Sequence, residues 1–532
     1  MIPTRLRNLR LSKEHFILIG LFLVMFLAHL FLRRPAFQSD ESVYAYSAYA
    51  ISRGSVPYSG IQLAQPPLVY LALASLFTLV GPNLFFLSLA ESVLTLLTNV
   101  LVFVTAKRLK LHSSGFLFPL LSVVIYGVIT FENFSSSFLE ILLTFFIMLC
   151  TAIYALFVLN NEQHRSALFL VGVLMGVSLM VKYTSIVFSI GLVLFHWSWL
   201  ILKRRHKRAV VDGLVLVLGA AIPVVISLAV IAFIWGSFGQ FYLQSVYWQT
   251  VRWSTPLDLR VFNFLVYALK FFSLLILSGI GILLIYFRTK NFQALFFPII
   301  FVFNFVGLTS VFTTFLLHYL YYLSPFLALL SAFGLAGALG FIRNSPWNFK
   351  INKKNLAKFL IFVTIVALTV EVNAQVYFAR DFNDDNTHLK VGQYISQITK
   401  SNDKIWTSEG AIAFFAERII VAANSSDWPI HSAFSDIFAY DFNTYKGALM
   451  KDYKNGVITP EQFVESWESD KTKAIVIIRG VDWVPYPDEL LWSGFNNLSG
   501  ASGYIQEKYL LNQTFISADG FHVHEVWVRK QE

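Results

Sequence analysis

The sequence predicts a polytopic α-helical membrane protein that ends in a water-exposed α/β domain. Of its 532 residues, 56% are hydrophobic and only 14% are charged, and the mean hydropathy is +0.62. This balance is typical of chains that cross a membrane many times and excludes an ordinary water-soluble globular protein. Long apolar runs continue to about residue 375, after which polar and apolar residues are mixed. We therefore expect a transmembrane domain over 1–375 and an α/β domain over 376–532.

About eleven transmembrane helices are expected, because each apolar run approaches the ~20 residues that a bilayer requires. The runs lie at 16–32, 84–105, 115–131, 137–159, 166–181, 184–202, 209–235, 262–287, 294–312, 319–342 and 356–375. Those at 115–131 and 166–181 are short for a span.

The basic residues predict the orientation in the membrane. Lys and Arg gather before the first run, in KRRHKR (203–208) and in 343–358, whereas the alternate loops carry few; Arg33 and Arg34 are the exception. By the positive-inside rule, the N-terminus is cytoplasmic, and the first external loop (33–83) and the C-terminal domain are extracytoplasmic, at the plasma membrane. Four Asn-x-Ser/Thr sequons fall on the predicted external side, at Asn133, Asn424, Asn497 and Asn512. The net charge of +10 thus sets topology and favours membrane lipid, not nucleic acid, as a partner.

Residue patterns after 376 predict the elements of the α/β domain. Helices are expected at 387–400 and 409–418, and strands at 403–408, 419–423, 472–480 and 520–530.

An acidic pair, Asp40-Glu41, opens the first external loop. Ser39 can cap a helix there, and acids in a first helical turn complement the helix dipole without any further purpose. The pair nevertheless lies at the predicted outer membrane surface, and the stretch that it begins, ESVYAYSAYAIS (41–52), is too polar to span. A partly desolvated carboxylate at that depth can act as a general base towards an incoming hydroxyl group.

The stretch SDESVYAYSAYAISRGSVPYSGIQLAQPPLVYLALA (39–74) resembles the first external loop of GT-C glycosyltransferases. It is most similar to glycosyltransferase family 39, which includes protein O-mannosyltransferases and bacterial aminoarabinose transferases. The runs GVLMGVSLMVKYTS (172–185) and HYLYYLSPFLALLSAFGL (318–335) resemble later spans of that family. The resemblance implies transfer of a single hexose or pentose, with inversion, from a polyprenyl (dolichyl-type) phosphate donor to a hydroxyl-bearing protein, lipid or glycan at the extracytoplasmic face.

The resemblance also assigns roles to residues. Asp40 is the expected general base, with Glu41 as its support or as a metal ligand, and Lys182 and His318 are expected at the donor phosphate. Further donor-binding candidates are Gln65, Tyr319, Arg53 and Arg252. A second acidic site is expected at Glu140 and Glu132. No cofactor is certain; a divalent cation such as Mg or Mn would have Asp40, Glu41 and Glu140 as its candidate ligands.

Several of these residues have a structural alternative. Lys182 ends an apolar run, so it can snorkel to the interface or pair with Glu140, since opposite charges in adjacent spans do so readily. Tyr319 can belong to an aromatic belt at headgroup level. Gln65 replaces the Lys or His that the relatives carry before their Pro-Pro pair, which removes a charge from this position.

Three other classes of protein would each leave a feature that this sequence does not show. An oligosaccharyltransferase should carry a Trp-Trp-Asp-Tyr-Gly-type motif, and the sequence has none. A transporter should show broken or charged spans at mid-membrane in two related halves, whereas polar groups here gather at the external ends. A membrane sensor with an external ligand-binding domain would need a cytoplasmic output domain, and the internal loops are too short for one.

Overall fold

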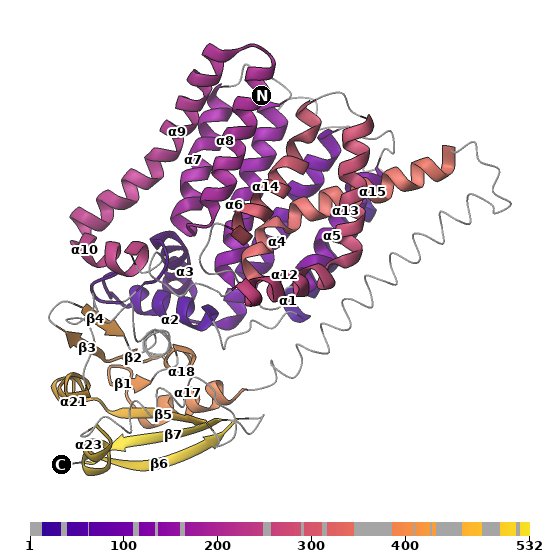
Figure 1. The fold of residues 1–532 in the computed structure, drawn as a ribbon. Coiled ribbons are helices and arrows are strands. Elements are labelled where there is room, and N and C mark those ends of the chain that lie inside the picture. The colour runs from indigo at the N-terminus through magenta and orange to yellow at the C-terminus, as the bar shows by residue number, and fades with distance from the viewer. Residues whose placement is uncertain are drawn as a thin grey trace, which may run out of the picture.

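A bundle of long helices carries an α/β unit at one end, with α2 and α3 lying between the two (Figure 1). The computed structural model describes residues 13–32, 40–61, 63–109, 116–132, 137–159, 165–247, 257–288, 292–310, 317–344, 386–407, 410–425, 428–431, 460–480, 501–517 and 522–531. The predicted domain boundary at 375/376 lies outside these residues.

The bundle is built from the following elements. They are α1 (Lys13–Leu32), α2 (Asp40–Ser52), α3 (Pro67–Val80), α4 (Leu84–Leu109), α5 (Leu117–Glu132), α6 (Phe138–Ile153), η2 (Tyr154–Val158), α7 (Arg165–Val181), α8 (Ser185–Leu202), α9 (His206–Ala229), η3 (Val230–Ile234), α10 (Phe238–Phe241), η4 (Tyr242–Tyr247), α12 (Leu257–Lys270), α13 (Phe272–Arg288), η5 (Phe292–Leu295), α14 (Phe296–Ser310), η6 (Leu317–Leu323) and α15 (Ser324–Asn344).

The polytopic fold that the sequence predicts is confirmed in its main features. By length and composition, seven of the described helices can cross a membrane, or eight if one bent pair counts as a span. The predicted runs at 115–131 and 166–181 form shorter apolar helices, α5 and α7. The run at 356–375 lies outside the described residues, so the number eleven stays a prediction.

The predicted span at 262–287 consists of two helices with a sharp bend between them. Its two halves, α12 and α13, meet at an angle of 83°. Phe271 lies at the corner, where its buried ring is 4.8 Å from the ring of Tyr267. The charged residue Lys270 interrupts the apolar run just before this corner, and hydropathy averaged over the whole run hides the interruption.

Small residues set the closest helix contacts in the bundle. A Cβ added to Gly176 of α7 would lie 2.2 Å from the carbonyl oxygen of Ala220 in α9, and one added to Gly334 of α15 would lie 1.9 Å from that of Leu277 in α13. Glycine therefore lets each pair of backbones touch, as in other membrane helix pairs. Among the candidate spans, the segment Leu320–Leu339, which comprises the end of η6 and most of α15, is the most buried, at 89%, against 11% for the span in α1.

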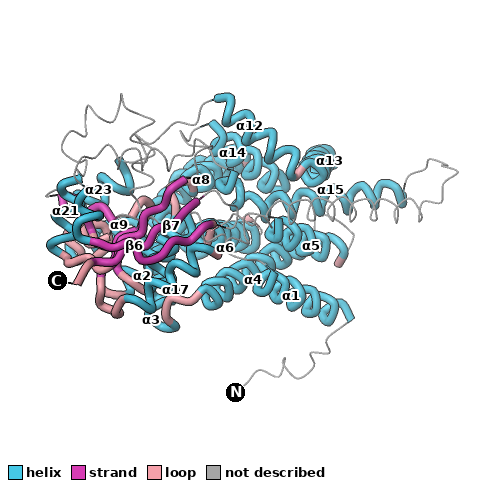
Figure 2. The backbone as a smooth tube through the Cα atoms, turned by 90° about the horizontal axis from the view of Figure 1, so that it is seen from below, coloured by secondary structure: helices cyan, strands magenta, loops and turns pink. Residues whose placement is uncertain are grey.

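The α/β unit is a sheet with helices on both faces. Its elements are α17 (Thr387–Ile398), β1 (Lys404–Thr407), α18 (Gly410–Ala416), β2 (Ile419–Ile420), β3 (Ala422–Ser425), β4 (Trp428–His431), α21 (Pro460–Ser469), β5 (Ala474–Gly480), α23 (Ala501–Lys508), β6 (Tyr509–Ile516) and β7 (His522–Arg529). The sheet order is β2-β1-β5-β7-β6, in which β2, β1 and β5 run parallel and β7 runs antiparallel to β5 and β6. Figure 2 views this end of the molecule.

Alternation along β5 explains the two-sided covering of the sheet. Ala474 and Val476 belong to the same apolar core as the bundle, α17 and α18. Ile475 and Ile477 point to the opposite face, where they pack with Trp406 and Trp467. Since side chains alternate along a strand, one face of β5 joins the unit to the bundle and the other forms a separate core. The predicted helices at 387–400 and 409–418 and the predicted strands at 403–408, 472–480 and 520–530 correspond to α17, α18, β1, β5 and β7. The strand predicted at 419–423 is divided into β2 and β3, which belong to different sheets, and β4, α21, α23 and β6 were not predicted.

The crossing of α7 and α9 can be tested with matched glycines. Gly176→Ala should lower the midpoint of thermal unfolding in detergent, because the new methyl group would press on the α9 backbone. Gly279→Ala in α13 is the control, since a Cβ at Gly279 meets nothing within 4 Å. Unchanged midpoints for both variants would contradict the close packing of α7 against α9.

Candidate active site

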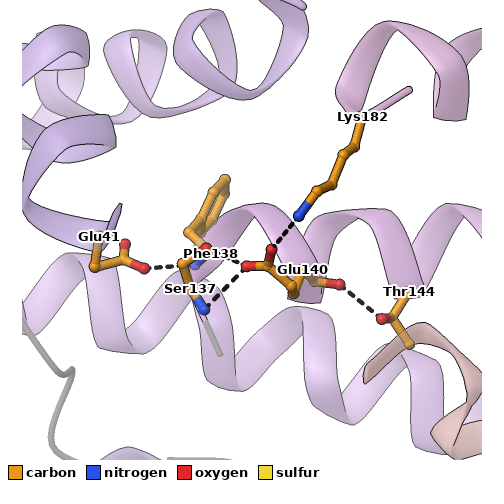
Figure 3. A network of polar contacts seen from close by, with 6 residues as sticks. All are labelled: Glu41, Ser137, Phe138, Glu140, Thr144 and Lys182. Carbon is orange, nitrogen blue, oxygen red and sulfur yellow. Dashed lines mark hydrogen bonds and ion pairs between the residues drawn. The ribbon is translucent and has the colours of Figure 1, made fainter. Parts of the chain in front are cut away.

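The second residue of α2 reaches across to the beginning of α6. The carboxylate of Glu41 accepts a hydrogen bond from the backbone N–H of Phe138, with a nitrogen-to-oxygen distance of 2.7 Å (Figure 3). Glu41 is 3% exposed. The first N–H groups of a helix have no partner within it, and they carry the positive end of the helix dipole. Glu41 therefore anchors α2 to α6 and sets the rotation of α2 about its own axis.

A second carboxylate serves the same helix end. Glu140 accepts the backbone N–H of Ser137 at 3.2 Å, and the Ser137 side chain accepts the backbone N–H of Glu140, so the two residues form a capping box. The Ser137 hydroxyl group also donates a hydrogen bond to the Glu140 carboxylate. Its other oxygen lies 2.6 Å from Nζ of Lys182. The hydroxyl group of Thr144 donates to the carbonyl oxygen of Glu140 at 2.6 Å. Glu140 thus links the beginning of α6 to the residue that follows α7.

These contacts form one buried polar network that joins three elements, as Figure 3 shows. It contains two carboxylates and one ammonium group, each from a buried residue: Glu41, Glu140 and Lys182. Charges in a low-dielectric interior are stable only when they are paired and hydrogen-bonded. The structure meets this condition with the ion pair and with the N-terminal N–H groups of α6.

The loop that follows α2 is held by the segment 237–244. Tyr58 has a φ of 66°, which is uncommon for a bulky residue, and its hydroxyl group donates to the carbonyl oxygen of Gln65 at 3.0 Å. Burial holds the pKa of Tyr58 well above its usual range, so the hydroxyl group stays a donor. Gln244 donates to the Tyr58 carbonyl oxygen at 2.9 Å and accepts the Leu63 N–H at 3.2 Å. The backbone around Gln65 is therefore rigidly positioned, and Gln65 itself is buried.

The α/β unit packs directly on α2. The N–H of Ile420 donates to the hydroxyl group of Tyr46 at 2.8 Å, and the rings of Tyr49 and Phe414 lie 6.4 Å apart. A Cβ on Gly410 would lie 3.2 Å from the carbonyl oxygen of Ser42, which explains the small residue at the beginning of α18. α2 is thus held at its first turn by α6 and along its length by α18 and β2.

The remaining predicted site residues are only partly placed. Asp40 is the first residue of α2, Glu132 is the last of α5, and His318 and Tyr319 lie in η6; the side chains of all four are outside the described residues. Arg53 follows α2 and is exposed. Arg252 lies outside the described residues. The structure therefore brings Glu41, Glu140 and Lys182 together, and the ion pair anticipated between Glu140 and Lys182 is present.

Sequence reasoning missed the residues that complete the network. Ser137 lies three positions before Glu140, which is the spacing of a capping box, so this signal was available. The contact between Glu41 and Phe138 joins positions 97 residues apart and has no local signal. The same holds for Tyr46 and Ile420, and for Tyr58 and Gln244.

Comparisons with known proteins agree with the resemblance found for residues 39–74. The profile of the family described as dolichyl-phosphate-mannose-protein mannosyltransferase matches residues 64–235, a segment that includes Gln65, Glu140 and Lys182. No curated protein matches the chain in sequence.

Solved structures with the same fold were found. ArnT from Cupriavidus metallidurans bound to undecaprenyl phosphate has a TM-score of 0.58 at 12% identity, covering 97% of this chain and 98% of that one. AglB from Archaeoglobus fulgidus, in complex with an inhibitory peptide and a dolichol-phosphate, has a TM-score of 0.53 at 10% identity over 97% of this chain and 75% of that one. The oligosaccharyltransferase of the same organism with Zn and sulfate has a TM-score of 0.52 at 12% identity over 96% and 73%. The chain therefore has the GT-C-like fold that the resemblance of residues 39–74 predicts.

The described residues do not fit a divalent cation. Glu41 is bound to the Phe138 N–H, and Glu140 is bound to Lys182 and Ser137. Within the described ranges, no group of three or more His, Cys, Asp or Glu side chains could hold a metal ion. A cation here would depend on Asp40, whose side chain is not among those described.

A double-mutant cycle tests the ion pair. Glu140→Gln and Lys182→Met should each destabilise the protein, because removing one member of a buried pair costs about 3–5 kcal/mol. The double variant should lose less than the sum of the two, since it leaves no unpaired charge. Thermal unfolding in detergent measures all three variants, and strictly additive losses would contradict the pairing.

The contact between α2 and the α/β unit makes a separate prediction. Tyr46→Phe leaves the buried Ile420 N–H without its acceptor, which costs about 1–3 kcal/mol. Amide hydrogen exchange at Ile420 and Val421 should become faster, while Tyr286→Phe, at an exposed position of α13, should leave it unchanged. Equal exchange rates in the Tyr46→Phe variant and the wild type would show that the hydrogen bond does not hold the two parts together.

Proposed function

We propose that the chain is an integral-membrane glycosyltransferase that moves a single sugar from a polyprenyl phosphate to a hydroxyl-bearing acceptor at the extracytoplasmic face. The observation that carries the proposal is the buried network of Glu41, Glu140 and Lys182 at the beginning of α2 and α6. It lies within a fold similar to proteins solved with undecaprenyl phosphate and with dolichol-phosphate. Part of it also lies within the segment that matches the mannosyltransferase family profile.

Asp40 acts as the general base in this proposal. It removes the proton from the acceptor hydroxyl group as the oxygen attacks the anomeric carbon of the sugar. The bond between that carbon and the phosphate oxygen breaks, and polyprenyl phosphate leaves. Attack from the face opposite the leaving group inverts the anomeric configuration. Glu41 does not compete for the proton in this scheme, because its carboxylate holds the α6 N–H and positions α2.

Lys182 stabilises the negative charge of the phosphate group, a role for which a preorganised cation is well suited. Its ion pair with Glu140 holds the buried ammonium group in one place. Gln65, held in a rigid loop, supplies hydrogen bonds and no charge. His318, Tyr319, Arg53 and Arg252 complete the proposed donor site, and Glu132 the second acidic site.

A lipid-linked donor favours a site at this depth. The isoprenoid chain stays in the bilayer, so its phosphate reaches the protein at the membrane surface, where the proposed first external loop lies. Transfer of a preassembled oligosaccharide is the second candidate, favoured by the fold shared with an oligosaccharyltransferase. Single-sugar transfer is preferred because the sequence lacks the Trp-Trp-Asp-Tyr-Gly motif.

Sugar transfer by the detergent-purified full chain tests the proposal. A panel of polyprenyl-phosphate sugars is offered beside the matching nucleotide sugars, with wild type compared against Asp40→Asn. Loss of the base should lower turnover by at least about 100-fold while donor binding is kept. Glu507→Gln, at an exposed position of α23, is the control and should turn over like wild type. Turnover that survives Asp40→Asn removes Asp40 as the base, and a folded protein that neither binds nor consumes a lipid donor favours a transporter or sensor instead.

A further inference from the structure

The edge strand of the α/β sheet carries an irregularity at a recognisable sequence. Among the described strands, β6 pairs with β7 alone and lies at the end of the sheet. Its register shifts between Leu511, which faces Trp527, and Gln513, which faces Val526. Asn512 is thus the extra residue of a β-bulge, and it begins the sequon Asn512-Gln513-Thr514. The side chains of all three sequon residues are exposed.

The amide group of Asn512 is held in a defined position. Its Nδ2 atom donates one hydrogen bond to the hydroxyl group of Tyr394, at 2.8 Å. Tyr394 belongs to α17, and its ring lies 5.6 Å from that of Phe515. An Asn amide carries two hydrogens, so one is engaged with Tyr394 and the other can be replaced without loss of this contact.

Asn512 lies among exposed apolar side chains on the edge strand β6. Leu510 is 60% exposed and Ile516 is 66% exposed, and Leu511 is also an exposed large apolar residue. An edge strand with free backbone groups and apolar side chains is a template for unwanted pairing between chains. Proteins avoid this with charged residues, prolines, β-bulges or a covering group. Residues 510–516 carry the bulge at Asn512 but include neither a charge nor a proline, so their exposed apolar side chains stay open to a covering group.

We propose that Asn512 carries an N-linked glycan that covers the β6 edge. Nδ2 of Asn512 forms a bond to the anomeric carbon of a sugar, the bond from that carbon to a lipid-linked phosphate or diphosphate breaks, and Nδ2 loses one proton. The donor is a polyprenyl-linked glycan, and the transfer is performed by the oligosaccharyl-transferring enzyme of the cell. The inference rests on the proposed function in one respect, the extracytoplasmic location of the α/β unit.

The test begins with the full chain purified from membranes of the cells that naturally make it. Glycopeptide mass spectrometry should find the peptide that contains Asn512 carrying a saccharide. The added mass of the saccharide should be absent from the Asn512→Gln variant. It should also be absent from the Thr514→Ala variant, which keeps the asparagine but destroys the sequon. Finding this peptide only in its unmodified form overturns the inference.

A sidedness control separates this failure from failure of the proposed function. In the Asn512→Gln background, Lys400→Asn with Asn402→Thr builds a sequon in the exposed turn after α17. The native protein and this engineered variant are each translated in the presence of endoplasmic reticulum microsomes. A glycan on the engineered sequon together with an unmodified Asn512 in the native protein refutes only the inference. An unmodified engineered sequon places the α/β unit on the cytoplasmic side and refutes both.

Discussion

The N-terminal end of α6 depends on two carboxylates that reach it from different directions. Glu41 arrives from α2 and binds the Phe138 N–H, while Glu140 folds back from within α6 itself and binds the Ser137 N–H. Helix ends present unpaired N–H groups, and leaving these groups buried without partners is costly. The hydrogen bond from the N-terminal end of α6 to Glu41 therefore fixes the position of α2. It also places the acidic pair Asp40-Glu41 at a defined position beside the bundle.

Burial strengthens the electrostatic interactions in this network, and it also makes an unpaired charge there costly in free energy. In a low-dielectric interior, each charge requires a partner, and the ion pair between Glu140 and Lys182 meets this requirement with atoms 2.6 Å apart. The α/β unit then braces α2 from the other side through Tyr46 and Phe414. α2 is thus held between the bundle and the unit, so the geometry at its first turn depends on residues that are distant in the sequence.

Local patterns predicted much of the fold, and long-range contacts account for what they missed. Apolar runs identified most of the long helices, but the 83° corner at Phe271 lies inside a run of high hydropathy. β6 was missed because its exposed side chains give no alternation of apolar and polar residues. At the site, opposite charges in neighbouring spans suggested the Glu140–Lys182 pair. The role of Glu41 at the α6 end could not be read from the sequence, because its partner is a backbone group 97 residues away.

The most direct test of the site is an experimental structure of the full chain with a polyprenyl phosphate bound. We expect the phosphate group within hydrogen-bonding distance of Nζ of Lys182, with Glu140 still paired to that lysine and Glu41 still bound to the Phe138 N–H. Asp40 should face the side of the phosphate from which an acceptor can approach. A phosphate bound elsewhere in the bundle, without contact to Lys182, would contradict the proposed placement of the active site at the junction of α2, α6 and α7.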